Sequence, residues 1–209
     1  MVPVPAQLFV DRCKEQCLNC LRAIAMVGSF ARGDQRPKSD IDFIVLVDSV
    51  DKRLLEQVGK VVTSIRTDNE INPALAAESE LVQAPEVFDW LPIKHDGIFL
   101  FGQHPEILSC RMSELDLAKQ IAKDVLMSSR HYIAVAEPKE NFADGKLWFW
   151  NLKPLAFALR FYEYHLSGRY IRGLDELSKK YTVLKRDPAK EYPVILDECI
   201  DVCEKILEA

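Results

Sequence analysis

Residues 27–45 read VGSFARGDQRPKSDIDFIV, and this stretch decides both the fold and the candidate site. An apolar segment ends at Val27, and the pair Gly28-Ser29 then interrupts it. Small residues at such a turn allow backbone N–H groups and a hydroxyl to approach phosphate oxygens. Residues 40–48 follow, with β-branched side chains after a polar start, which is typical of a strand. The stretch therefore predicts two strands joined through a phosphate-binding turn.

Two aspartates begin the second of these strands. Residues i and i+2 of a strand point to the same side, so Asp40 and Asp42 project from one face, about 7 Å apart at Cα. Neighbouring carboxylates repel each other unless a cation lies between them. Mg²⁺ or Mn²⁺ suits this position because it prefers oxygen ligands and accepts phosphates and water as well. The alternative is that Asp40 is a turn residue and Asp42 an exposed strand residue without a ligand.

The same stretch resembles the signature of the polymerase-beta-like nucleotidyltransferase superfamily. That signature is an apolar residue, Gly, Gly or Ser, a loop, and then Asp, an apolar residue, and Asp or Glu. Ten residues separate Ser29 from Asp40 here. The fuller pattern, Gly-Ser-x-Ala-Arg-Gly followed by Ser-Asp-Ile-Asp, is similar to the minimal and the aminoglycoside nucleotidyltransferases. The resemblance implies a small mixed-sheet catalytic domain that uses a nucleoside triphosphate such as ATP.

The resemblance also implies roles for individual residues. Gly28 and Ser29 would hold the β- and γ-phosphates, and Asp40 and Asp42 would bind two Mg²⁺ ions that activate the acceptor hydroxyl. Further contacts to the nucleotide would come from Arg32, Lys38 and Ser39.

A third carboxylate usually follows on a later strand in this superfamily. The best match is Glu70, which would share a strand face with Asn72, and Asp68 is the second choice. Glu70 would complete a metal site or take the proton of the acceptor. The alternative is that Glu70 is an ordinary charge on an edge strand, in which case activity would be low or absent.

The pattern of the chain changes after Pro105 and predicts an α+β protein with two domains. The nucleotidyltransferase domain would span residues 1–108 and an all-α bundle residues 109–209. The predicted strands are residues 23–27, 40–48, 69–76 and 97–102. The predicted helices are residues 7–21, 52–64, 87–93, 115–135, 147–166, 174–181 and 193–207. The bundle resembles HEPN domains and the C-terminal domain of kanamycin nucleotidyltransferase, which implies that it helps to form an acceptor pocket.

Cysteines and one Arg–His pair offer two other interpretations. The spacing of Cys13, Cys17 and Cys20 is that of an iron–sulfur motif, but it is also the i, i+4, i+7 stripe of a helix packed in a core. Arg160 and His165 fit the short ribonuclease expression of some HEPN domains, although so short an expression arises easily by chance. The cysteine pattern favours core residues. Arg160 and His165 are more simply explained as surface or pocket residues of an amphipathic helix, and a ribonuclease role stays an alternative.

The predicted function is Mg²⁺-dependent transfer of a nucleoside monophosphate, in particular AMP, to a hydroxyl of a small molecule or a protein. The net charge of −5 disfavours a long nucleic acid as partner, and no apolar run predicts a membrane span. The six cysteines are not spaced as in a small secreted disulfide scaffold, which favours the reducing cytoplasm. Three alternatives stay open: an RNA or tRNA nucleotidyltransferase, an antitoxin-like nucleotide-binding partner with little turnover, and a ribonuclease that uses Arg160 and His165. A homodimer could complete the cleft of so short a chain.

Overall fold

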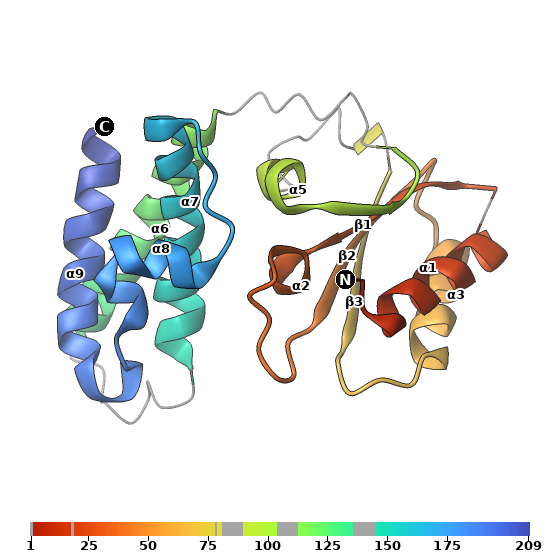
Figure 1. Ribbon diagram of the computed structural model, residues 1–209, viewed down its shortest axis with the longest axis horizontal. Coiled ribbons are helices and arrows are strands. Elements are labelled where there is room, and N and C mark those ends of the chain that lie inside the picture. The colour runs from red at the N-terminus through yellow and green to blue at the C-terminus, as the bar shows by residue number, and fades with distance from the viewer. Residues whose placement is uncertain (1, 18, 78, 81–89, 104–112, 136–144) are drawn as a thin grey trace. The chain divides into compact units, whose positions relative to one another are not determined.

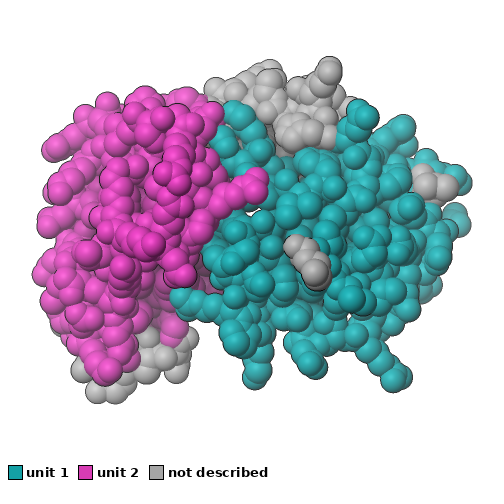
Figure 2. Space-filling model, in the orientation of Figure 1, with its two compact units in different colours: residues 1–111 teal, residues 112–209 magenta. Residues whose placement is uncertain are grey.

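The computed structural model describes residues 2–17, 19–77, 79–80, 90–103, 113–135 and 145–209. Two compact units make up the chain, Met1–Arg111 and Met112–Ala209, and Figure 2 colours them teal and magenta. The predicted boundary between residues 108 and 109 lies outside the described residues. Unit 1 combines a mixed sheet with helices, whereas the described part of unit 2 is helical, so the predicted α+β class is confirmed.

Four strands form the sheet of unit 1, in the order β3-β2-β1-β4. The strands are β1 (Leu21–Val27), β2 (Ile41–Val47), β3 (Ile71–Ala77) and β4 (Ile98–Phe101). β1 pairs antiparallel with β2 and with β4, whereas β2 pairs parallel with β3. All four predicted strands are therefore present, with shifted ends. Pro73 lies in β3, at one end of the strand order, where a residue without an N–H is tolerated.

The helices of unit 1 differ from prediction mainly at one end of the first. They are α1 (Val4–Cys17), α2 (Gly28–Arg32), α3 (Lys52–Ser64) and α5 (Trp90–Asp96). α1 ends at Cys17 because the N–H of Cys20 turns back to the Cys17 carbonyl, 3.1 Å away, and Leu21 already begins β1. The prediction of one helix over residues 7–21 is therefore wrong beyond Cys17. The predicted helix over residues 87–93 lies partly outside the described residues.

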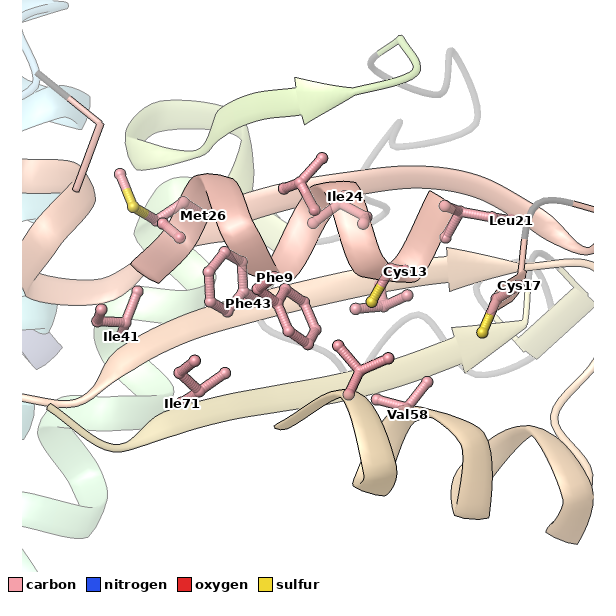
Figure 3. Close-up of a cluster of buried hydrophobic side chains, with 14 of the residues drawn as sticks. Phe9, Cys13, Cys17, Leu21, Ile24, Met26, Ile41, Phe43, Val58 and Ile71 are labelled. Carbon is pink, nitrogen blue, oxygen red and sulfur yellow. The ribbon is translucent and has the colours of Figure 1, made fainter. Parts of the chain in front are cut away.

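One face of the sheet carries the main core of unit 1. Alternate residues of β1, β2 and β3 point toward α1 and α3, which cover this face in Figure 1, and Figure 3 draws their side chains. The rings of Phe9 and Phe43 lie 4.5 Å apart between centroids, and both side chains are fully buried. Burial of such a side chain contributes about 1.5–3 kcal/mol. This core holds the strands in place while the opposite face of the sheet keeps its polar residues.

The opposite face has a smaller core beneath α5. Ala23, Leu46 and Ala76 pack there with Ile93 of α5. Strand alternation places Asp42 on the same face as Leu46, because the two residues are four positions apart in β2. The aspartate lies at the start of β2, beyond the row of apolar residues. The site is therefore built on the face that α1 and α3 do not cover.

Unit 2 consists of helices over its described residues. They are α6 (Glu114–Ala134), a π-helical turn (Trp148–Leu152), α7 (Lys153–Ser167), α8 (Leu174–Lys180), a 3₁₀ turn (Thr182–Lys185) and α9 (Pro188–Glu208). Ser113 caps α6 through a reciprocal capping box with Asp116. Pro154 follows the π-helical turn, where its missing N–H removes a helical hydrogen bond. No helix in the described ranges is long and apolar enough to cross a membrane.

The described cysteines are buried, with one partial exception. Burial raises the pKa of Cys13 and of Cys203 to about 12, and it also raises the pKa of Cys17 and Cys199. Cys20 is only partly covered, and its Sγ donates to the Cys17 carbonyl. Neutral thiols are poor metal ligands and poor nucleophiles. The cysteines of α1 therefore belong to the core, as expected.

This burial predicts a pattern of alkylation. In the native protein at pH 8, iodoacetamide should modify Cys20 faster than the four buried cysteines, because their thiols are covered and stay protonated. Peptide mass spectrometry over a time course measures the order, and alkylation in urea provides the fully reactive control. Rapid native modification of Cys13 would contradict the packing of α1.

Candidate active site

Three residues form a row across the sheet at the point where β1 ends. Val27 pairs with Asp42 in the antiparallel ladder, and Asp42 pairs with Asn72 in the parallel ladder. Paired residues of neighbouring strands point to the same face of a sheet. The carboxylate of Asp42 thus lies between the end of β1 and the start of β3.

Gly28 packs directly against this carboxylate. Its φ of +71° lies in the left-handed region, which L side chains rarely adopt. A Cβ at this position would overlap Oδ2 of Asp42 and lie 3.1 Å from its Cγ. The glycine predicted from the sequence is therefore required twice, by its backbone conformation and by the close approach of Asp42.

Ser29 lies in the first turn of α2, the short helix that follows. Its carbonyl accepts from the N–H groups of Gly33 and Asp34, at 2.9 and 3.0 Å, which closes the helix. Gly33 takes the left-handed cap position with φ 81°. The first N–H groups of any helix lack partners within it. The structure therefore brings Ser29 and these N–H groups next to Gly28 and Asp42.

A short loop then leads from α2 to the two aspartates. Lys38 is exposed in this loop and has a left-handed φ of 68°, which is uncommon for a residue with a Cβ. The hydroxyl of Ser39 accepts from the N–H of Arg36 at 2.8 Å, and its carbonyl accepts from Nδ2 of Asn69 at 2.9 Å. Ser39 therefore shapes the loop, while Lys38 is exposed in it two residues before Asp40. Asp40 itself is exposed and precedes β2 by one residue.

Arg32 has a different place from the one expected. Its side chain is only 7% exposed and forms ion pairs with Asp34, Nε to Oδ2 at 3.2 Å, and with Asp96, Nη1 to Oδ2 at 3.5 Å. Asp96 is fully buried at the end of α5. The guanidinium therefore ties α2 to α5. Asp34 and Asp96 therefore hold the guanidinium of Arg32 in this structure, and its contact with a phosphate stays a prediction.

Glu70 does not join the two aspartates. It is exposed and lies one residue before β3, and its carbonyl accepts from the N–H of Ile41 at 2.7 Å. Asp68, the second choice, is exposed as well. Among the described residues, no three His, Cys, Asp or Glu side chains converge in a way that could hold a metal ion. Within the part of the chain that the structure describes, neither Glu70 nor Asp68 therefore supplies a third carboxylate beside Asp42.

Asn72 takes the place next to Asp42 instead. Its Nδ2 donates to Oδ1 of Asp42 at 3.0 Å. The sequence places Asn72 on a strand face with Glu70 but indicates no role for it. The signal that could have found it is the parallel register, in which Ile41 aligns with Ile71 and Asp42 with Asn72. That register is a property of the folded sheet and cannot be read from the local sequence.

The donor set of the site fits a hard divalent cation. Asp40 and Asp42 offer only carboxylate oxygens, which Mg²⁺ and Mn²⁺ prefer. Gly28 leaves open, beside Oδ2 of Asp42, the space that a side chain would fill. The residues present therefore suit a cation that also uses oxygens from phosphates and water.

A family model described as a nucleotidyltransferase domain matches residues 8–147, well over half of the chain. The chain belongs to this nucleotidyltransferase family. An enzyme that transfers a nucleoside monophosphate is therefore the general assignment, and the predicted family is confirmed. The likeness of unit 2 to HEPN domains stays a prediction.

The nucleotidyltransferase fold is also found in a solved structure. The chain is similar to spectinomycin adenyltransferase AAD(9) from Enterococcus faecialis, whose crystal structure contains ATP and spectinomycin. The two are 11% identical, and the match covers 98% of this chain and 97% of that chain with a TM-score of 0.53. At this identity the likeness concerns the fold. No curated protein matches the chain.

In unit 2, Arg160 and His165, the two residues that fit the ribonuclease expression, lie on different sides of α7. Arg160 is buried, and its Nε donates to the carbonyls of Ile171 and Arg172 at 3.2 Å each. His165 is exposed in the last turn of α7. Five positions on a helix separate the two side chains by about 140° around the axis. Arg160 therefore anchors the segment after α7.

Proposed function

We propose that this protein transfers AMP from ATP to a hydroxyl of a small-molecule acceptor, with Mg²⁺, and releases pyrophosphate. The family match supports nucleotidyl transfer in general. The likeness in fold to an adenyltransferase that was crystallised with ATP and spectinomycin supports the nucleotide and the class of acceptor. The acidic chain suits a small acceptor better than a long polynucleotide.

One observation carries the proposal: the close approach of Gly28 to Asp42 at the end of β1. A glycine with positive φ that leaves no room for a Cβ beside a carboxylate has a specific use there. It brings the backbone of a phosphate-binding turn and a cation-binding side chain to the same place. Triphosphate and cation bind together in phosphoryl transfer, so the two parts need this proximity.

The residues of the site would divide the work as follows. Asp40 and Asp42 would hold Mg²⁺. The bound ion would neutralise the negative charge that develops on the leaving pyrophosphate. The N–H groups and hydroxyl of the Gly28-Ser29 turn would bind the β- and γ-phosphates. Lys38 would add a positive charge near the same phosphates from its exposed loop.

The experiment measures pyrophosphate release from each of the four ribonucleoside triphosphates with Mg²⁺ and a pool of hydroxyl-bearing small molecules. We expect release from ATP that requires Mg²⁺ and an acceptor, and we expect Asp42→Asn to remove it. Asp48→Asn is the matched control, because Asp48 lies just past the other end of β2 and pairs with Arg22. Mg²⁺-dependent release that survives in Asp42→Asn would overturn the proposal. Pyrophosphate release with a protein acceptor, but not with the pool of small molecules, would change the proposed acceptor from a small molecule to a protein.

A second candidate is a nucleotide-binding partner module with little turnover. The observation that favours it is the position of Glu70, which leaves Asp40 and Asp42 without a third carboxylate among the described residues. Equilibrium binding of ATP and Mn²⁺ distinguishes the two. Tight binding that Asp42→Asn weakens, together with no pyrophosphate release from any pool, would favour the module.

A further inference from the structure

Asn72 occupies a specific position beside the carboxylate of Asp42. The two residues are paired in the parallel ladder, and Nδ2 of Asn72 lies 3.0 Å from Oδ1 of Asp42. An ionised carboxylate only accepts hydrogen bonds, so the amide nitrogen must face it. The bond therefore joins the amide of Asn72 to one particular oxygen of the aspartate.

The other oxygen of Asp42 has a different neighbour. Oδ2 lies where a Cβ of Gly28 would be, against the backbone at the end of β1. The terminal torsion of an aspartate is soft, so a carboxylate without such neighbours rotates easily. Here an amide from β3 donates to one oxygen, and the backbone of Gly28, at the start of α2, approaches the other. The orientation of the carboxylate plane thus depends on Asn72.

Asn72 also sets the charge around Asp42, because its side chain is neutral. A carboxylate at this position would lie within hydrogen-bonding distance of Asp42 and would add a third negative charge to the group. Opposite charges attract more strongly as the negative charge around a cation increases. Two acidic groups and an amide therefore bind a divalent cation less tightly than three acidic groups would.

We infer that Asn72 is a positioning residue for the cation site. It orients Asp42 and, among the residues that the structure describes, limits the acidic groups of the site to Asp40 and Asp42, so that the cation binds chiefly together with the triphosphate. This inference rests on the proposed function, because it concerns the cation that the proposed reaction uses. The oxygens of the nucleotide supply the negative charge that a third carboxylate would otherwise give.

The test measures the affinity of the whole protein for Mn²⁺ by titration calorimetry, both without nucleotide and with α,β-methylene ATP present. Asn72→Ala is expected to weaken binding of Mn²⁺ with the nucleotide about tenfold, the size of effect typical of a residue that orients a ligand. Asn72→Asp is expected to tighten binding of Mn²⁺ alone about tenfold or more. Asn19→Asp is the matched control, because it adds the same charge at the exposed turn before β1, the opposite end of that strand from Gly28.

The two variants are expected to change the affinity for Mn²⁺ in opposite directions, which a general loss of structure would not do. Unfolding temperatures without metal identify any variant that is not folded, and Asn72→Ser replaces Asn72→Ala in that case. Wild-type affinity in both Asn72 variants would overturn the inference while leaving the proposed function intact. Absence of Mn²⁺-dependent nucleotide binding in the wild type would overturn the proposed function itself. Equal tightening by Asn19→Asp would assign the effect to net charge and also overturn the inference.

Discussion

Gly28→Ala is expected to reduce nucleotidyl transfer about 100-fold or more, to the level of a protein without the Asp42 carboxylate. The new Cβ would overlap Oδ2 of Asp42 and force the carboxylate or the turn to move. Misplacement of a reacting group by about 1 Å costs on the order of 10²-fold in rate. The positive φ adds roughly 1–2 kcal/mol of backbone strain to the cost of folding.

Gly33→Ala is the matched control for this substitution. Gly33 has a similar φ of +81°, but a Cβ there meets nothing within 4 Å. We therefore expect the same loss of stability from backbone strain and near-normal transfer. Urea unfolding and pyrophosphate release measured on both variants compare the two effects. Equal loss of transfer in both variants would mean that strain in the turn, and not the approach to Asp42, limits activity.

The sequence predicted the local parts of this site because their signals are local. Gly28 stands where only a glycine fits, and Asp40 and Asp42 alternate within a β-branched segment. Such signals depend on the conformation of a few neighbouring residues. For the same reason the sequence predicts the four strands but not how they pair with one another.

The parts that were not predicted depend on contacts between distant residues. Asn72 lies beside Asp42 because of the parallel register, and the ion pair of Arg32 reaches Asp96, 64 residues away. A local pattern offers Glu70 and Asn72 equally, since both lie near the start of a strand. Only the pairing of β2 with β3 decides which of them faces Asp42. The register therefore places the amide of Asn72 beside Asp42, where a carboxylate was expected.

Arg32→Ala is expected to destabilise the protein by about 3–5 kcal/mol, because it leaves the fully buried carboxylate of Asp96 without its cationic partner. Asp34, whose side chain is 13% exposed, loses the same cation. Denaturant unfolding measures the change. Arg22→Ala is the matched control, because the ion pair of Arg22 with Asp48 is exposed and such pairs contribute about 0–1 kcal/mol.

A second variant tests why the loss occurs. Asp96→Asn combined with Arg32→Met removes the buried carboxylate together with the guanidinium, so the double variant should recover part of the stability lost in Arg32→Ala. Affinity for ATP, measured where Arg32→Ala is folded, should stay close to wild type because the guanidinium is committed to α5. Normal stability with weakened ATP binding would instead make Arg32 a phosphate ligand. That result would require the guanidinium to leave Asp96 when nucleotide binds, and α2 would then be held by its packing against β1 and β2 alone.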